Sequence, residues 1–433
     1  MFIGGDTIVE SGFDEQPFGE SLRRRMRNAD LTVVNLEGAV EGTGDPLTKS
    51  GAIKETTERT PTVLADAGID AVTLANNHAM DLGADGLLET ISMLEDADIG
   101  ICGAGSDAEA ALKPHREMVS SGSTEVALFG LCEREFGVAD ASEPGTAWIN
   151  HPNARRRVEA TSEEVDVTVV FPHGGIEYVP FPPIGRRRSI RRFVDAGADV
   201  VAGHHPHVAQ GWERMDSTPV FYSLGNFLFE QTKRPSTRKG LALEVTFHGD
   251  TPIEVELIPI AFANCKVREM ADDADASELL RHIHRLGRLT ADDLEPHWQE
   301  VADKVFLQRY ANWLREVGGG DPIKRLANPG DHLRNGGLWD PSRRESELLI
   351  LLNLVRNESH RAVIETALEL RTGIITDHRT SATVEQTRSL LEETEDRPIT
   401  DPPSKSRLRL EALFDRIAGS VPERPLRTAD KKT

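Results

Sequence analysis

Three of the chain's fourteen histidines fall within eight residues, GHHPHVAQ at 203–210, directly after the mostly apolar run 198–202. A short run of this kind predicts a buried strand, so the histidines would lie where that strand ends. Three earlier segments share the arrangement, an apolar run followed by a potential ligand: 31–35 before Glu37, 71–75 before Asn76, Asn77 and His78, and 165–171 before His173. In an open α/β sheet the ligand crevice lies outside the carboxyl ends of the strands. We therefore predict an α/β fold in which these four strand ends meet at one site.

The residue types at these strand ends are those of a metal site. Imidazole, carboxylate and amide oxygen together suit Mn, Fe, Zn or Mg. The three cysteines, Cys102, Cys132 and Cys265, lie outside the motifs, which argues against a structural thiolate zinc site. One buried histidine such as His173 would more often be a hydrogen-bonded core residue, but four strand ends in order favour a site. A carboxylate that bridges two cations supports in-line displacement at phosphorus. We expect one or two divalent metal ions and hydrolysis of a phosphate ester.

Six motifs in order make the resemblance to a known family specific. They are GGDTIVESG from Gly4, VVNLEGAV from Val33, LANNHAMDLGADGL from Leu74, FPHGGIEYVPFPP from Phe171, GHHPHVAQG from Gly203 and YSLGNFLF from Tyr222. Together they resemble the CapA/PgsA family, which is associated with poly-γ-glutamate capsule biosynthesis and whose domain is related to the calcineurin-like metallophosphatases. The resemblance covers residues 1–262 and implies a double β-sheet sandwich flanked by helices (αββα).

Carried over residue by residue, the resemblance implies a set of metal ligands and one acid. The ligands would be Asp6 as the first carboxylate, Glu37 as the bridging acid, Asn77 as the amide, and His173, His205 and His207 as the imidazoles. His204 is an alternative ligand or a donor behind the ligands, although the spacing of His205 and His207 matches the H-x-H pair of the metallophosphatases. His78 would protonate the leaving group.

Two positions depart from the metallophosphatase pattern. Those enzymes usually place a histidine two residues after the first aspartate, where this chain has Ile8. One metal would then lack a ligand unless Glu10 or water replaces it, so a single-metal site or a weakly occupied second site is an alternative. The bridging acid is Glu37 where many phosphatases use aspartate, and its longer side chain changes the geometry.

Several nearby residues have two interpretations each. Asp81 would either orient His78 or cap the helix that follows, where carboxylates favour the positive end of the dipole. Glu177 and Tyr178 would hold substrate or close a proline-rich loop. Asn226 would bind ligand or form a turn.

Five arginines lie between 186 and 192, at the start of a predicted helix. Arginine binds carboxylate or phosphate through a bidentate fork, so the cluster is either an anion receptor, with Arg186 as a substrate contact, or a solvated helix face. No nucleic-acid motif accompanies it, and the net charge of −21 opposes nucleic-acid binding.

Composition predicts a setting for the protein. Asp and Glu total 71 against 50 Lys and Arg, and only 11 of those 50 are Lys, a balance that resembles proteins of salt-accumulating halophiles. The first strand begins directly after Met1, which leaves no room for a signal peptide, and no window approaches eighteen apolar residues. If the start codon is correctly assigned, these features predict a cytoplasmic protein without a membrane span.

The hydrophobic pattern divides the chain into three parts. Residues 1–265 alternate strand and helix patterns, with helices at 60–67, 84–94 and 189–196 and β-rich segments at 219–224, 241–247 and 253–259. Residues 270–395 form a helical extension, with helical periodicity at 276–317 and 346–370 on either side of a Gly/Pro/Asn-rich stretch. These helices would pack on the first domain or on a second copy, giving a homodimer. Residues 396–433 are predicted to be a mobile tail with one short helix.

Two functions from different classes follow. The first is a metal-dependent, phosphoesterase-like hydrolase with an anionic small molecule or polyglutamate as substrate. The second is a non-catalytic accessory protein that binds anionic polymer or metal during polyglutamate synthesis. Retention of Asn77 beside His78 favours the enzyme, whereas Ile8 favours the accessory protein. Hydrolysis of a γ-glutamyl bond at the same centre is a third interpretation.

Overall fold

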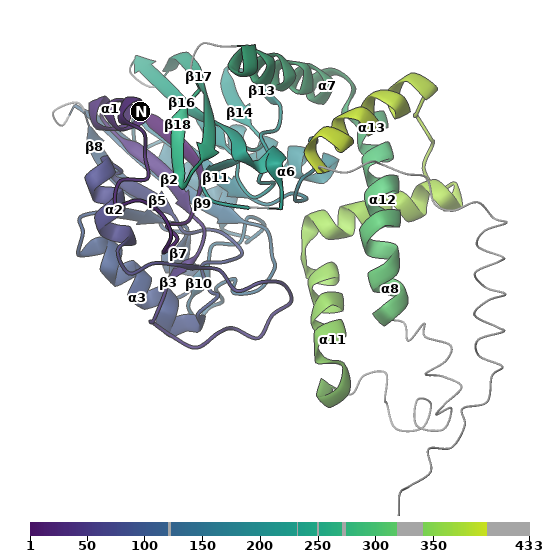
Figure 1. Ribbon diagram of the computed structural model, residues 1–433, viewed down its shortest axis with the longest axis horizontal. Coiled ribbons are helices and arrows are strands. Elements are labelled where there is room, and N and C mark those ends of the chain that lie inside the picture. Colours follow the sequence, from purple (N-terminus) through teal and green to yellow (C-terminus); the bar gives the residue numbers. More distant parts are fainter. Residues whose placement is uncertain (120–122, 232, 249–250, 271–273, 318–340, 396–433) are drawn as a thin grey trace, which may run out of the picture. The chain divides into compact units, whose positions relative to one another are not determined.

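Two β-sheets carry the strands that end in polar side chains. The computed structural model describes residues 1–119, 123–231, 233–248, 251–270, 274–317 and 341–395 (Figure 1). The first sheet contains, in spatial order, β18 (Lys266–Glu269), β17 (Thr251–Ala263), β16 (Lys239–His248), β1 (Phe2–Thr7), β2 (Thr32–Leu36), β5 (Ala71–Thr73) and β6 (Gly100–Cys102), with β15 (Asn226–Leu228) also paired to β1. The second contains β13 (Trp212–Met215), β14 (Thr218–Phe221), β12 (Val200–Ala202), β11 (Val167–His173), β9 (Thr124–Cys132) and β8 (His115–Val119). Two short pairs, β3 (Ala39–Val40) with β4 (Glu55–Thr56) and β7 (Ala104–Gly105) with β10 (Gly145–Thr146), lie outside these sheets.

The central strands of each sheet run parallel. β1, β2, β5 and β6 pair in parallel in the first sheet, and β9, β11, β12 and β14 do so in the second. The carboxyl ends of parallel strands meet at one edge of a sheet, which is where such folds place their ligands. This edge carries the polar residues picked out from the sequence.

Alternating side chains along each strand divide the core into layers. Ile3 and Val33 of the first sheet belong to the same buried cluster as Val169 of the second, so the two sheets pack face to face. Their neighbours Phe2 and Val34 point to the opposite face and belong to a separate cluster. This is the two-residue period expected of strands that are buried on both faces.

Helices cover the outer face of each sheet. α1 (Glu20–Asn28), α2 (Thr60–Ala67) and α3 (Gly83–Glu95) contribute buried side chains to the cluster on the first sheet (Figure 1). α4 (Ala108–Ala111), α5 (Ala154–Ser162) and α6 (Ile184–Val194) do the same on the second sheet. The layers are helix, sheet, sheet and helix, which confirms the predicted αββα class with helices following it in the sequence.

The helical segments after residue 273 differ in detail from the predicted ones. They are α7 (Ala274–Val305), a π-helical turn (Phe306–Tyr310), α8 (Ala311–Val317), α11 (Pro341–Arg356), α12 (Glu358–Thr372) and α13 (Ser381–Glu395). The continuous periodicity over 346–370 is interrupted at Asn357, whose side chain accepts a hydrogen bond from the His360 amide and so begins a new helix. α7 has a non-helical residue, Asp293, three positions before Pro296. Proline cannot donate the helical hydrogen bond and its ring clashes with the preceding turn, which accounts for the kink.

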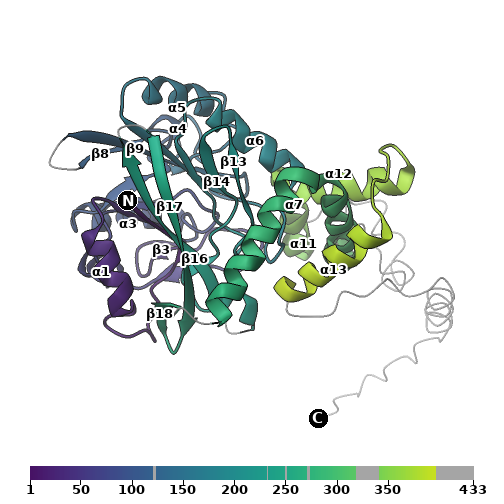
Figure 2. The same cartoon turned by 90° about the horizontal axis from the view of Figure 1, so that it is seen from above.

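The described residues fall into two units, one that contains residues 1–306 and 352–395 and one that contains residues 307–317 and 341–351. Within the first unit, α12 and α13 pack on α7 (Figure 2). Trp298 donates a hydrogen bond to Thr366 at 3.1 Å, and His297 lies 2.7 Å from the hydroxyl of Thr387. Helices from the extension are therefore part of the same unit as the sheets.

Two of the predicted segments, the Gly/Pro/Asn-rich stretch at 318–340 and the tail at 396–433, lie outside the described residues. Among the residues that the structure does describe, no helix is long and apolar enough to cross a membrane.

Candidate metal centre

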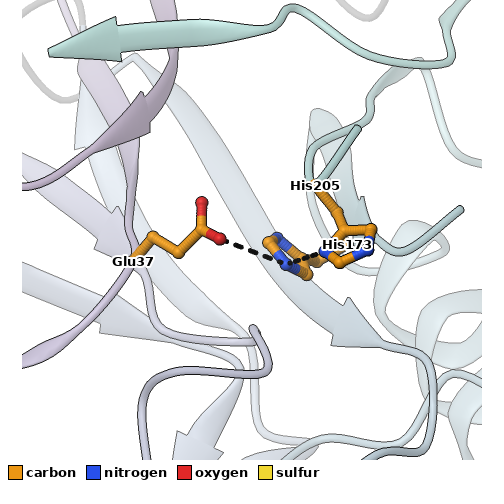
Figure 3. A group of neighbouring side chains, drawn as sticks. All are labelled: Glu37, His173 and His205. Atoms are coloured by element: carbon orange, nitrogen blue, oxygen red, sulfur yellow. Dashed lines mark hydrogen bonds and ion pairs between the residues drawn. The ribbon is translucent and has the colours of Figure 1, made fainter. Parts of the chain in front are cut away.

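The four predicted strand ends, those of β2, β5, β11 and β12, converge with the end of β1. Asp6 lies near the end of β1, Glu37 directly after β2 and His173 at the end of β11, while His205 and His207 follow β12. All five side chains are buried. Figure 3 shows Glu37 from one sheet facing His173 and His205 from the other.

Two groups of potential ligands share one carboxylate. Asp6, Glu37 and His207 form the first group, and Glu37, His173 and His205 form the second; within each group the ligand atoms all lie within 4.8 Å of one another. Oε1 of Glu37 is 3.7 Å from Nε2 of His207 and 4.0 Å from Nε2 of His173. Glu37 is therefore in the position of a bridging acid.

Asn77 lies beside the second group. Its Oδ1 is 3.0 Å from Nε2 of His173, and the same nitrogen is 3.2 Å from Nδ1 of His205. An amide oxygen and two imidazole nitrogens with lone pairs directed at one another repel unless a proton or a cation lies between them.

The Glu37 carboxylate provides the clearest sign that a cation belongs here. Neither of its oxygens has a hydrogen-bond partner among the described residues, although both are fully buried. Burial, with the nearby charge of Asp6, raises the pKa of Glu37 well above its usual range. A buried carboxylate that accepts no hydrogen bond is costly, and a divalent cation is a natural partner for one facing imidazoles. The residues present therefore fit a metal ion.

The histidines divide into two electrostatic types. Burial lowers the pKa values of His173 and His205 well below the usual range, with their histidine neighbours adding to the effect. Both rings are therefore neutral, the form that binds metals. Burial also opposes a charge on His207, but Glu37 and Asp6 outweigh it and raise its pKa to about 10.

The loop after β12 holds its histidines in strained backbone. His205 has φ of +100° and His207 of +58°, in the left-handed region that side chains other than glycine rarely adopt. The first carboxylate helps to fix this loop, because Oδ2 of Asp6 accepts a hydrogen bond from the His205 amide at 3.3 Å. Backbone strain of this kind persists where the surrounding structure over-determines it, often at functional sites.

His78 lies beside the ligands in a network of its own. Its Nδ1 is 2.7 Å from Oδ2 of Asp81, which orients the ring. Lys49 forms an ion pair with Asp81 and donates to the Asn77 carbonyl at 3.2 Å. Asp81 also accepts the Lys54 amide at 2.7 Å, so it lies next to His78 and does not cap a helix. Of its two interpretations, orientation of His78 is the one that agrees with these contacts.

The residues expected to contact substrate lie around His207. Asn226 Oδ1 is 2.9 Å from Nδ1 of His207, and the Tyr178 ring centroid is 6.0 Å from that of His207. Glu177, whose side chain is 43% exposed, approaches Nε2 of His207 to 3.9 Å. The structure therefore brings all three next to His207.

Arg186 and His204 lie behind the centre. Arg186 is buried, pairs with Glu133 at 3.3 Å and donates to the Pro172 carbonyl at 2.8 Å. These contacts hold Arg186 in the wall behind His173, with its guanidinium group directed at protein atoms. His204 points its Nε2 at the Gly4 carbonyl at 3.2 Å, which corresponds to the interpretation of a residue behind the ligands.

Other arginines of the same helix are held by carboxylates. Arg187 forms a two-bond contact with Glu213, and Arg191 bonds to Asp195 and Asp216. For these two arginines, the contacts agree with a solvated helix face, which was the alternative to an anion receptor for the arginines at 186–192.

Sequence reasoning missed four charged residues around the centre: Lys49, Lys54, Glu133 and Glu135. The lysines lie in the irregular segment between β3 and β4, and the acids follow β9, so no periodic pattern marks either pair. Only the position of the acids in the chain could have indicated them, since residues 133–135 directly follow a parallel strand, as the predicted metal ligands do.

The two positions tied to the missing histidine ligand give a simple result. Ile8 is buried, and Glu10 belongs to neither ligand group among the described residues.

The fold and the site define a class of protein, an αββα sandwich with a histidine and carboxylate cluster at the carboxyl ends of its strands. Residues 2–231 match the family described as bacterial capsule synthesis protein PGA_cap. That match spans more than half of the chain, and the chain belongs to this family.

Similar proteins carry related names. The chain is 32% identical to the capsule biosynthesis protein CapA of Bacillus anthracis, over 40% of this chain and 43% of the relative. It is 34% identical to the PGA biosynthesis protein CapA of Bacillus subtilis, over 41% and 47% respectively. The chain thus spans less than half the length of these two relatives. A probable polyglutamine synthesis accessory protein of Mycobacterium tuberculosis is 25% identical over 63% of this chain and 76% of its own length.

Two solved structures with a related arrangement of elements are distant in sequence. One is the sulfate thiohydrolase SoxB of Thermus thermophilus, with a TM-score of 0.35 and 12% identity over 60% of this chain and 45% of the other. The second is a 5'-nucleotidase of Candida albicans, with a TM-score of 0.39 and 14% identity over 66% and 57%.

Proposed function

We propose that this capsule-synthesis family member is a metal-dependent hydrolase of the phosphoesterase type that acts on an anionic substrate in polyglutamate synthesis. The observation that carries the proposal is the shared Glu37 carboxylate, buried between two ligand groups with no hydrogen-bond partner in the described part of the chain. A centre with that arrangement accommodates two cations.

The ligands would be those of the two groups together with Asn77. Asp6, Glu37 and His207 would hold one divalent ion, and Glu37, Asn77, His173 and His205 the other. When bound, such ions supply an activated water and polarise the bond to be broken. The ligand set of oxygen and imidazole donors fits Mn, Fe, Zn or Mg and does not choose between them.

The chain's own residues would bind the substrate and move a proton. Asp81 holds Nδ1 of His78, which leaves the other ring nitrogen to serve a leaving group. Lys54 lies 5.0 Å from the centroid of the Phe229 ring, which in turn packs edge-on against His207. An ammonium group at this point would attract an anionic substrate towards the centre.

One observation favours the alternative, a non-catalytic accessory protein that binds anionic polymer or metal. Ile8 stands where a metallophosphatase has a histidine ligand, so the Asp6 group has three members in place of four. A weakly held ion in that group would serve assembly better than turnover. Cleavage of a γ-glutamyl bond is the third outcome to be tested.

The experiment that decides between them measures metal content and hydrolysis together. Full-length protein and Glu37→Ala are compared in high salt with added Mn, using a phosphodiester, a phosphomonoester and a γ-glutamyl peptide. Glu89→Ala is the control, because Glu89 is an exposed carboxylate of α3 that belongs to neither group. Turnover that is lost in Glu37→Ala and kept in Glu89→Ala supports the hydrolase. Bound metal with no turnover on any of the three substrates supports the accessory protein.

A second variant tests the acid. His78→Ala should retain its metal but lose turnover by about 10²- to 10⁴-fold, the usual contribution of a general acid. An unchanged rate would contradict the role assigned to His78.

A further inference from the structure

The amino terminus of α12 lies against the candidate metal centre, although this helix is outside the residues that match the family. Asn357 is buried there and uses both ends of its amide. Its Oδ1 accepts the His360 amide at 2.8 Å and caps the helix, while its Nδ2 donates to Oε1 of Glu135 at 3.1 Å. Capping needs only the first of these bonds.

Glu135 continues the connection to a candidate ligand. Burial raises the pKa of Glu135 to about 7, and the Asn77 side chain opposes this shift as a hydrogen-bond donor to the carboxylate. Oδ1 of Asn77 faces His173 and the second ligand group, at 3.0 Å from Nε2. The NH₂ group at the other end of the amide is therefore the end that can donate to Glu135. Without Glu135, the two ends of this amide could exchange places.

Neighbouring contacts hold this part of α12 rigidly. Ser359 donates its amide and its hydroxyl to Glu133, at 3.2 Å and 2.8 Å. Glu358 accepts from the Trp148 indole at 2.8 Å and from Asn150 at 2.9 Å. The start of the helix is therefore fixed on both sides of Asn357.

We propose that Asn357 and Glu135 are positioning residues of the metal centre, through which the helical extension fixes the orientation of the Asn77 amide. This inference rests on the proposed metal site. Partners that orient metal ligands typically change metal affinity by about 10- to 100-fold when they are removed. The extension thus contributes to the chemistry of the centre as well as to folding.

The test separates positioning from capping. Asn357→Ser keeps a good N-cap but has no amide to reach Glu135, and Glu135→Gln keeps the size of the side chain while offering Asn77 an ambiguous partner. Thr366→Val is the matched control, because it removes a hydrogen bond of the same helix to Trp298, away from the centre. Mn affinity of each full-length protein is measured by calorimetry, and thermal unfolding without metal is measured in parallel.

We expect Asn357→Ser and Glu135→Gln to bind Mn about 10- to 100-fold more weakly than the parent, with Asn357→Ser unfolding close to the parent temperature. Thr366→Val should bind Mn as the parent does. Equal Mn affinity in the parent and both variants would overturn the positioning role alone. Equal weakening in Thr366→Val would also overturn it, by showing that the effect is merely structural. A parent that binds no Mn would remove the proposed function and this inference together.

Discussion

At the scale of single residues, the centre combines features that are unfavourable for folding in the absence of metal. Glu37 is buried with no hydrogen-bond donor in the described part of the structure, and the charge of Asp6 lies close by. His205 and His207 adopt left-handed backbone conformations. Functional sites often carry strain that the rest of the fold must offset. The stability of this protein should therefore depend on whether metal is bound.

Glu37→Gln should separate stability from function. Removing the buried charge should leave the metal-free protein as stable as the parent or more stable, by up to about 1–3 kcal/mol. The same change should abolish the increase in unfolding temperature that Mn gives the parent, because the shared ligand is lost. Thermal unfolding with and without Mn measures both effects. A metal-free variant that is clearly less stable than the parent would show that the ion pair between Glu37 and His207 outweighs the cost of burying the carboxylate.

The three cysteines should differ in reactivity. Burial raises the pKa of Cys102 to about 12 and that of Cys132 to about 12, whereas Cys265 is partly exposed. Only the thiolate reacts, and access is needed as well. At pH 8 a disulfide reagent should therefore modify one thiol quickly in the native protein and all three in urea. Rapid modification of Cys132 in the native protein would contradict its burial beside Thr146.

At the scale of elements, the centre depends on how closely β1 passes the loop before β15. A Cβ atom on Gly5 would lie 2.1 Å from the Gly225 carbonyl oxygen, and that oxygen accepts the amide of Asp6 at 3.1 Å. The absence of a side chain at Gly5 is thus what lets β1 place Asp6 at the centre.

Gly5→Ala should destabilise the protein by about 1–3 kcal/mol, because the strand must move to relieve this overlap. Since Asp6 moves with it, Mn affinity should fall as well. Gly12→Ala is the control: an added Cβ there meets no described atom within 4 Å, and its effect should be within about 1 kcal/mol. Urea unfolding and Mn titration of both variants test this. Comparable results for the two variants would mean that β1 has more freedom than the structure shows.

At the scale of the whole molecule, the sheets and the packed helices of the extension form one unit. Ile283 of α7 lies in the buried cluster between the sheets, and Trp298 on the same helix is almost fully buried. Val363 of α12 and Leu390 of α13 are also fully buried. The extension therefore shares its core with the domain that matches the family.

Truncation after Phe306 should cost several kcal/mol, since each large apolar side chain that loses its cover contributes about 1.5–3 kcal/mol. Urea unfolding of the truncated and full chains measures the loss. Truncation should also weaken Mn binding, because it removes Asn357. A truncated protein with the parent's unfolding midpoint would show that these helices fold independently of the sheets.

The αββα class and the identity of the strands that end in polar groups could be predicted from the sequence because both depend on local pattern. Apolar runs with polar residues at their ends specify buried parallel strands wherever they occur. The boundaries of α12 were less accessible, since the apolar period runs through Asn357 and only its capping bond ends one helix and begins the next. The kink at Asp293 similarly depends on Pro296.

Local patterns in the chain are enough to specify the fold class, the family and the residues from which a metal centre can be built. How these residues are used depends on packing: Glu37 is shared by two groups, His204 turns to Gly4, Arg186 pairs with Glu133, and Asn357 reaches Glu135. The two kinds of interaction differ in their range along the chain. Periodicity and capping act between neighbours in the chain, whereas these contacts join residues that are brought together only when both sheets and the extension pack.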